Sequence, residues 1–284
     1  MKGSHALAMP LSKFYGKWAF ADSKGVSSLQ QNLPQFSDYL IDLKSKNELL
    51  FESDLERFDS ELKQGLYFDS NIPTGYGVGS SGALCAAFFD VFCEDIGYDL
   101  PNLKKIFGQM ESFFHGSSSG TDPLICYLNQ PILIRSKEEM VVTRLPKENL
   151  AEKGHIFLLD TKITRQTGPF VQIFLKKCEQ ENYNKKCESL FAPQINVAIN
   201  YFLEANWENL WESFHKIGVF QLEYFEEMIP DVFKKFWESS LEGDLFKLKL
   251  CGAGGGGFIL GMTKDWEKTQ KKLKTHQLIS VFQF

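Results

Sequence analysis

Residues 72–83 read Ile-Pro-Thr-Gly-Tyr-Gly-Val-Gly-Ser-Ser-Gly-Ala. Every second position in its centre is a glycine: Gly75, Gly77 and Gly79. The missing Cβ atoms let the backbone amides turn towards an anion and approach it closely. Ser80 and Ser81 then open an apolar run, 83–89, that is typical of a buried helix. Such a loop predicts either a phosphate site at a helix N-terminus or a flexible turn capped by Ser80.

The spacing of this glycine loop differs from that of the common nucleotide-binding motifs. A P-loop ends in Gly-Lys-Ser/Thr, but no lysine lies between Gly65 and Asn102. The dinucleotide fingerprint fits no better, because the glycines alternate and no βαβ unit with an acidic ribose partner follows. The loop alone therefore leaves the class of ligand open.

Composition narrows the class of protein. The 284 residues, 43% of them hydrophobic and 14% aromatic, suffice for two ordinary domains. A net charge of −5 without a basic block argues against a nucleic-acid partner. No run of 18 apolar residues and no signal-peptide pattern occurs, so no membrane partner is expected. The six cysteines form no CxxC pair and mostly sit in apolar runs, which predicts buried thiols in a reducing, cytoplasmic compartment.

The order of secondary structure follows from periodicity. Strands are expected within 5–20, 48–58, 64–69, 131–134, 155–160, 245–250 and 258–262. Helices are expected over 32–50, from Ser80 to Gly97, from Pro101 to His115, across 169–239 and over 265–274. We expect 245–250 to be half-buried, because lysines alternate with apolar residues there. The charged stretch 138–153 is interpreted as a loop, which predicts domains at 1–150 and 151–284.

Two acidic residues follow the glycine loop. Glu111 falls about 40° beyond the apolar stripe of its helix, which favours a marginal glutamate that snorkels to water over a metal ligand. Asp122 precedes Pro123, which favours the cap of a short helix over a general base or an electrostatic partner for an attacking hydroxyl. A second glycine run, 252–257, is either a hinge or a close approach of backbone to a ligand.

Three separated blocks of the chain together resemble the GHMP kinases, the superfamily of galactokinase, homoserine kinase, mevalonate kinase and phosphomevalonate kinase. The blocks are Pro73–Ala83, Glu111 with Ser119-Gly120-x-Asp122, and Lys249–Gly257. The closest likeness is to mevalonate kinase, in the His115-Gly116 between the acidic residues and in Thr161-Lys-x-x-Arg-x-Thr167. The resemblance implies an α+β, two-domain GHMP kinase fold. Its N-terminal domain would be ribosomal S5 domain 2-like and its C-terminal domain ferredoxin-like.

The resemblance also implies an enzyme that uses ATP and Mg²⁺ to phosphorylate a hydroxyl of mevalonate or a similar small hydroxy acid. The residues implied to bind ATP are Gly75, Tyr76, Gly77, Val78, Gly79, Ser80 and Ser81 in the first loop and Gly252, Ala253, Gly254 and Gly255 in the second. Ser81 and Glu111 would hold Mg²⁺, and Asp122 would polarise the substrate hydroxyl. Arg165 and Thr167 would meet the substrate carboxylate. A homodimer is one expected assembly.

The chain departs from the family pattern at its start. Mevalonate kinases begin with a strand that carries Pro-Gly-Lys, whereas the likeness here starts at Gly3 and neither Lys13 nor Lys17 matches that lysine. A start codon placed too late and a true truncation both account for this. Phe220 stands where mevalonate kinases more often have a small residue, so phosphomevalonate, a sugar or homoserine is an alternative acceptor. The non-enzyme alternative is a truncated ATP-binding protein with little turnover.

Overall fold

The computed structural model describes residues 3–20, 32–94, 97–136, 138–164 and 167–284, and it confirms an α+β fold. The chain divides into two compact units. The C-terminal unit comprises Met1–Leu7, Thr74–Gly77 and Leu133–Phe284, and the N-terminal unit comprises Ala8–Pro73 and Val78–Ile132. The glycine loop is thus divided between the two units, with the division between Gly77 and Val78. The domain boundary at residue 150 stays a prediction.

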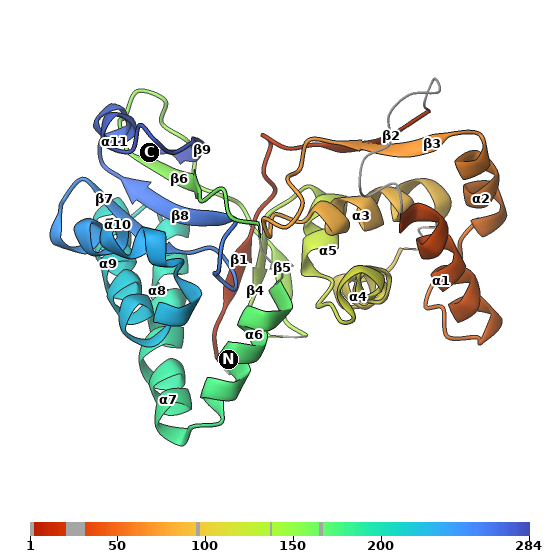
Figure 1. Cartoon of the computed structure of the whole chain (residues 1–284), viewed down its shortest axis with the longest axis horizontal. Coiled ribbons are helices and arrows are strands. Elements are labelled where there is room, and N and C mark those ends of the chain that lie inside the picture. Colours follow the sequence, from red (N-terminus) through yellow and green to blue (C-terminus); the bar gives the residue numbers. More distant parts are fainter. Residues whose placement is uncertain (1–2, 21–31, 95–96, 137, 165–166) are drawn as a thin grey trace. The chain divides into compact units, whose positions relative to one another are not determined.

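In its described residues, the N-terminal unit consists of a pair of strands and the helices α1 to α5 (Figure 1). Strands β2 (Gly16–Phe20) and β3 (Leu66–Ser70) run antiparallel, with Trp18 opposite Phe68. The helices are α1 (Leu33–Ser45), α2 (Leu55–Lys63), α3 (Ser80–Phe92), α4 (Leu100–His115) and α5 (Thr121–Leu128). Strands in 5–20 and 64–69 and the helices from residue 32, Ser80 and Pro101 are therefore confirmed.

Two predictions in this unit are wrong. Residues 48–58 do not form a strand; α2 begins there because Asp54 caps it, accepting a hydrogen bond from the Arg57 backbone N–H, and because Leu55 and Phe58 bury one helical face. Helix α3 ends at Phe92 rather than at Gly97, since Cys93 is already extended and pairs with Ser53.

Aromatic side chains fill the core of the N-terminal unit. The Phe58 ring lies 4.9 Å from the rings of both Phe88 and Phe92, and Trp18 lies 5.3 Å from Phe68. The Trp18 indole N–H also donates a 2.9 Å hydrogen bond to the Ala87 carbonyl oxygen. These contacts fix α3 against the β2–β3 pair, and with it the serines of its first turn.

The C-terminal unit contains a four-stranded antiparallel sheet in the order β7-β8-β6-β9 (Figure 1). The strands are β6 (His155–Asp160), β7 (Phe246–Leu250), β8 (Phe258–Thr263) and β9 (Leu278–Gln283). Helices separate β6 from β7 and β8 from β9, so the order is βαββαβ, as the resemblance to a ferredoxin-like domain implies. Strand β9 was not predicted, although Ile279 and Val281 alternate there with polar Ser280.

A second, three-stranded sheet has the order β1-β4-β5. Its strands are β1 (Ala6–Ala8), β4 (Ile132–Ile134) and β5 (Met140–Val142). Strand β5 lies inside 138–153, so interpreting that whole stretch as a loop is wrong. Met140 explains the strand, because its side chain is buried while the two valines that follow are exposed.

Helices make up most of the chain between β6 and β7. They are α6 (Thr167–Cys178), α7 (Glu181–Lys186), the π-helix η2 (Cys187–Phe191), α8 (Ala192–Leu203), α9 (Trp207–Tyr224), the 3₁₀ helix η3 (Glu226–Met228) and α10 (Asp231–Glu242). Helices α9 and α10 pack against β7. The last helix, α11 (Trp266–Lys272), is shorter than predicted, because Asp265 is its N-cap and accepts from the Lys268 N–H.

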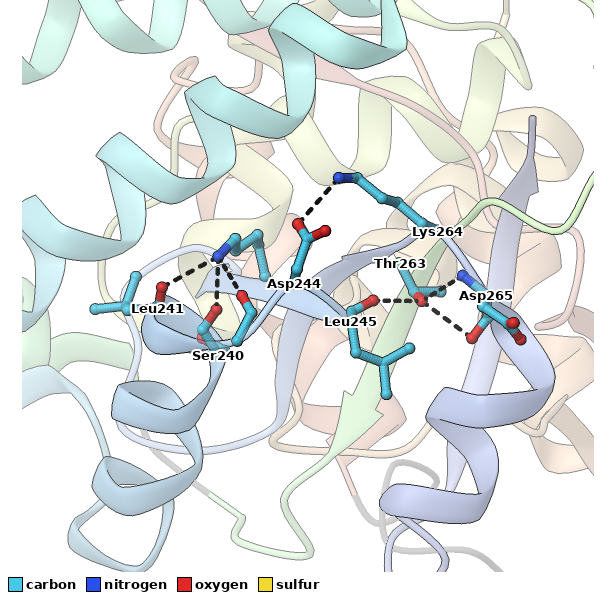
Figure 2. A network of polar contacts seen from close by, with 9 residues as sticks. Ser240, Leu241, Asp244, Leu245, Thr263, Lys264 and Asp265 are labelled. Carbon is cyan, nitrogen blue, oxygen red and sulfur yellow. Dashed lines mark hydrogen bonds and ion pairs between the residues drawn. The ribbon is translucent and has the colours of Figure 1, made fainter.

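Lys247 contradicts the prediction of a half-buried β7 strand, because its side chain is only 5% exposed. Figure 2 shows the polar network around the end of α10. There the Lys247 ammonium donates hydrogen bonds to the carbonyl oxygens of Ser240, Leu241 and Gly243, at 3.0, 3.2 and 2.7 Å. Carbonyls at a helix C-terminus lack partners within the helix. The lysine therefore stabilises the end of α10, although burial lowers its pKa.

None of the six cysteines, all of which lie in the described ranges, forms a disulfide, but the prediction that most are buried is wrong. Cys85 and Cys187 are buried, whereas Cys126 is exposed. Of the helices in the described ranges, none combines the length and the apolar character that crossing a bilayer requires.

Candidate functional site

Ser81 and Glu111 meet inside the N-terminal unit. Ser81 lies in the first turn of α3 and Glu111 in the last turns of α4, and the Ser81 hydroxyl donates a 3.1 Å hydrogen bond to Glu111 Oε1. Only 7% of Ser81 and 5% of Glu111 are exposed. The favoured interpretation of Glu111 as a marginal, snorkelling residue is therefore wrong, because its carboxylate points inward at a hydroxyl.

Two further residues, which the sequence analysis did not select, complete this cluster. The Ser118 hydroxyl donates to Glu111 Oε2, and His115 Nε2 lies 2.9 Å from Ser81 Oγ. Since the one Ser81 proton goes to Glu111, His115 must donate its Nε2–H to Ser81. The signal for His115 was present in the His-Gly between the acidic residues, whereas Ser118 is one of three consecutive serines that the sequence does not distinguish. We term Ser81, Glu111, His115 and Ser118 the hydroxyl–carboxylate cluster.

The Glu111 carboxylate accepts hydrogen bonds from two serine hydroxyls. Burial raises the pKa of Glu111, and the hydrogen bonds from Ser118 and Ser81 oppose that rise. Within the described part of the chain, no lysine or arginine forms an ion pair with Glu111 or Asp122. A buried carboxylate without a cationic partner is costly and is typical of sites that take up a cation or a proton.

Asp122 packs against the start of α3. A Cβ atom on Gly79 would lie 3.4 Å from the Asp122 Cβ, and one on Gly82 would lie 3.0 Å from it and 2.8 Å from the Pro123 nitrogen. The predicted capping role is wrong, because Gly120 in the left-handed conformation is the N-cap of α5 and Asp122 lies in its first turn. Asp122 as a whole residue is exposed. Desolvation by the surrounding protein and the nearby Glu111 nevertheless raise the pKa of Asp122 to about 6, against an opposing effect of His115.

A glycine pair brings the two acidic residues into one site. A Cβ on Gly120 would lie 2.0 Å from the Lys104 carbonyl oxygen and 2.6 Å from the Gly108 nitrogen. Glycine at 120 therefore allows the loop that carries Ser118 to lie directly on α4. The same contact sets the start of α5, and thus places Asp122 in the same unit as Glu111 and electrostatically close to it.

The first glycine loop has the backbone that its sequence predicts. Gly75, Gly77 and Gly79 have φ values of 79°, 69° and 77°, whereas Tyr76 and Val78 are not among the residues with positive φ. This alternation is the pattern of backbone nests that bind anions. Gly79 is the N-cap of α3, so the alternative of a turn capped by Ser80 is wrong. Val78, Gly79 and Ser80 lie in the N-terminal unit, whereas Thr74–Gly77 lie in the C-terminal unit.

The second glycine run is tightly packed within the C-terminal unit. A Cβ on Gly254, Gly255, Gly256 or Gly257 would lie 2.5 Å or less from Met228, Phe170, Ile163 or Tyr76, respectively. The hinge interpretation is therefore wrong, and close packing against protein explains these glycines. Gly252 is exposed and Ala253 is half-buried, so these two positions remain accessible to a ligand.

Of the two residues expected to bind the substrate carboxylate, Arg165 and Thr167, the structure describes the backbone of Thr167. Arg165 lies outside the described residues, and Thr167 is the first residue of α6. Thr161, which opens the same motif, donates a 2.7 Å hydrogen bond from its hydroxyl to the Gly257 carbonyl oxygen. The Thr161–Thr167 motif thus begins on the second glycine run.

The hydroxyl–carboxylate cluster fits Mg²⁺ by the chemistry of its donors. A serine hydroxyl and a carboxylate are hard oxygen ligands, and the Ser81 oxygen keeps one lone pair after its two hydrogen bonds. In the described ranges, no group of three or more histidine, cysteine, aspartate and glutamate side chains forms a metal cage. Two protein ligands suit Mg²⁺, which normally retains waters and substrate phosphates.

Comparison with known proteins identifies the fold. Residues 48–130 match the family described as GHMP kinases N terminal domain. None of the curated proteins matches the chain.

Several solved structures superpose on almost the whole chain at low sequence identity. Leishmania major mevalonate kinase in complex with R-mevalonate has a TM-score of 0.65 and 14% identity, over 99% of this chain and 90% of that one. Lactococcus lactis galactokinase complexed with galactose has a TM-score of 0.63 and 13% identity, over 99% of this chain and 88% of that one. Streptococcus pneumoniae phosphomevalonate kinase in complex with phosphomevalonate and AMPPNP has a TM-score of 0.60 and 15% identity, over 99% of this chain and 94% of that one. Residues 48–130 thus match the GHMP kinase N-terminal domain family, and the fold of the chain is similar to the folds of these three kinases.

Proposed function

We propose that this protein is an ATP-dependent small-molecule kinase that phosphorylates the hydroxyl of mevalonate. One observation carries the proposal: a buried carboxylate, Glu111, accepts a hydrogen bond from a serine that directly follows an anion-binding type of loop at a helix N-terminus. Phosphoryl transfer needs a cation beside phosphates, held by few protein ligands. The motif Thr161–Thr167 and the His-Gly at 115–116 favour mevalonate among the acceptors.

Each group then has a defined task. The amides of Gly75 to Ser80 would bind the phosphates, and Ser81 and Glu111 would hold Mg²⁺, which when bound neutralises charge on the phosphate oxygens. Gly252, Ala253, Gly254 and Gly255 are proposed to line the nucleotide site. Gly252 is exposed and Ala253 is half-buried, so this end of the run is the part open to a ligand.

Asp122 is the proposed acceptor of the substrate proton. The hydroxyl oxygen forms a bond to the γ-phosphorus while the bond from that phosphorus to the ADP oxygen breaks, and the hydroxyl proton passes to a carboxylate oxygen of Asp122. A pKa of about 6 makes this carboxylate more basic than an ordinary aspartate while it stays mostly ionised at pH 7. In a loose transition state the proton leaves late, so positioning near a negative charge supplies most of the effect.

Arg165 and Thr167 are proposed to bind the carboxylate of the acceptor, as a guanidinium and a hydroxyl can. The side chain of Phe220 packs in the core, where its ring stacks 4.8 Å from Phe191. Its size therefore does not by itself argue for a sugar or phosphomevalonate as the acceptor.

The test measures ADP release from ATP and Mg²⁺ against mevalonate, phosphomevalonate, homoserine and hexoses. A mevalonate signal that exceeds the others supports the proposal, and a larger signal with another acceptor assigns a different GHMP activity. If ATP raises the melting temperature while no acceptor is phosphorylated, the protein binds nucleotide without turnover and the kinase proposal is wrong.

A further inference from the structure

The tip of the first glycine loop is built onto the second glycine run. Residues Thr74–Gly77 belong to the same compact unit as Gly257. A Cβ on Gly257 would lie 2.3 Å from the Tyr76 carbonyl oxygen and 2.8 Å from its carbonyl carbon. Gly257 also has a left-handed φ of 68°. Two independent constraints therefore require glycine at 257, and one of them is the backbone of Tyr76.

The side chain of Tyr76 adds a second attachment to the same place. Its ring centroid lies 5.2 Å from that of Phe258, with the planes tilted by 59°. The Tyr76 hydroxyl forms a hydrogen bond with the carboxylate of Asp160, the last residue of β6, and burial together with this carboxylate raises the pKa of Tyr76. Ring, hydroxyl and backbone thus all contact the β6–β8 end of the sheet.

The surface that receives Tyr76 is itself held by hydrogen bonds. The Thr161 N–H and hydroxyl both donate to the Gly257 carbonyl oxygen, at 3.0 and 2.7 Å. The Gly257 N–H donates to the Ile163 carbonyl oxygen at 2.7 Å, and the Gly255 N–H donates to that of Met228. Gly257 therefore cannot shift to follow the loop, so the loop must conform to Gly257.

We propose that Tyr76 is a positioning residue, which attaches the tip of the first glycine loop to Gly257 and Phe258 and so preforms the backbone nest before an anion binds. The left-handed glycines on either side, Gly75 and Gly77, leave that segment intrinsically flexible. An anchor between them removes part of the entropy that an anion would otherwise have to offset. The identity of the anion, a nucleotide polyphosphate, depends on the proposed function, whereas the anchor does not.

Hydrogen–deuterium exchange of residues 72–82 in nucleotide-free protein tests the anchor. Tyr76→Ala removes ring and hydroxyl, and Gly257→Ala displaces the Tyr76 backbone. Both are expected to speed exchange of the loop amides by about threefold to tenfold, the size of a lost ring–ring contact. Tyr76→Phe keeps the ring on Phe258 and should change exchange less than Tyr76→Ala. Gly97→Ala is the matched control, because Gly97 has a φ of 80° but a Cβ there would meet nothing within 4 Å.

Loop exchange that is unchanged in Tyr76→Ala and Gly257→Ala overturns the proposal. If either variant fails to fold, Tyr76→Phe and Tyr76→Leu decide by their graded effect, and equal exchange in both and in wild type overturns it as well. ADP affinity is measured in parallel by calorimetry, with the expectation that Tyr76→Ala weakens it while Gly97→Ala does not. A wild-type protein that holds its loop but does not bind ADP would refute the proposed function and leave the anchor standing.

Discussion

The Ser81 hydroxyl donates a 3.1 Å hydrogen bond to Glu111 Oε1 across a separation of 30 residues in the chain. It joins the first turn of α3, which the glycine loop leads into, to α4, and both side chains are buried. Because the partners are shielded from water, a change in one leaves the other without a substitute. Several measurable consequences depend on this pairing.

Glu111→Gln keeps the size of the side chain but removes its charge. We expect turnover to fall by about 10²–10³-fold, the scale of one lost electrostatic contact at a phosphoryl group. We also expect Mn²⁺ binding in the presence of ADP, followed by electron paramagnetic resonance, to weaken in parallel. Glu56→Gln, an exposed substitution on α2, is the control. A Mn²⁺ titration identical to that of wild type would contradict the assignment of Glu111 as a metal ligand.

His115 orients the Ser81 hydroxyl. The effect of a substitution at 115 on Mn²⁺ affinity should therefore depend on whether the new side chain can still donate a hydrogen bond to Ser81. His115→Gln keeps an N–H that can reach Ser81 and should retain most Mn²⁺ affinity, whereas His115→Phe should weaken that affinity by about threefold to tenfold, as for one lost hydrogen bond. Equal affinities in the two variants would argue against a donor role.

Asp122→Asn should leave ADP affinity nearly unchanged and lower turnover by a few powers of ten, on the scale of lost positioning and electrostatic effects. The native enzyme should also lose activity as pH falls through about 6, where Asp122 takes up a proton. This acid limb should be absent from the residual activity of the variant. An unchanged turnover number in Asp122→Asn would rule out the proposed role.

Because the pKa of Asp122 is raised in the folded state, replacing Asp122 by a neutral side chain should stabilise the protein at neutral pH. The pKa of Asp122 is about 6 in the folded state and 3.8 without its surroundings, so the folded state binds more protons between these values and becomes less stable as pH rises through them. Asp122→Asn should therefore melt at a higher temperature than wild type at pH 7, and the difference should shrink towards pH 4. Calorimetric scans at both pH values check the sign.

Gly82→Ala should destabilise the protein, since the new Cβ would lie 2.8 Å from the Pro123 nitrogen and 3.0 Å from the Asp122 backbone carbon. We expect a loss of about 1–3 kcal/mol, typical of overpacking, together with a lower kcat because Asp122 is displaced. Gly168→Ala on α6 is the control for stability, because a Cβ there meets nothing within 4 Å. Equal stability of the two variants would show that α5 can move away from α3.

Lys247→Met should destabilise the C-terminal unit by about 1–3 kcal/mol, because three carbonyl oxygens at the end of α10 lose their donor. Lys264→Met is the matched control. Its ammonium pairs with Asp244 at the surface, where such pairs contribute about 0–1 kcal/mol. Urea unfolding of both variants compares the two effects.

The sequence predicted the elements whose pattern is local. The glycine alternation at 75–79 and the apolar run after Ser81 are sufficient for the loop and for α3. Strand β6 was predicted with its observed ends, because its apolar run is short and is followed by Asp160. The likeness to GHMP kinases was carried by blocks far apart in the chain, and the superposed structures confirm the fold.

The remaining features depend on contacts that a single sequence does not reveal. Burial of Glu111 results from the loop that carries Ser118, and that loop can lie on α4 only because Gly108 and Gly120 touch. The packing of Gly254–Gly257 likewise depends on Met228 and Ile163, which come from distant segments. Burial of Lys247 depends on the end of α10, whereas strand alternation alone predicts an exposed lysine.

The indole of Trp18 offers a spectroscopic view of the N-terminal unit. Of the five tryptophans, it is the one in the N-terminal unit, and its N–H is bonded to Ala87 on the helix that begins at Ser80. In protein labelled with 5-fluorotryptophan, a single fluorine resonance therefore reports on that helix, and Trp18→Phe would assign it. Any ligand that settles at the start of α3 can be followed by that one line, without a label on the ligand.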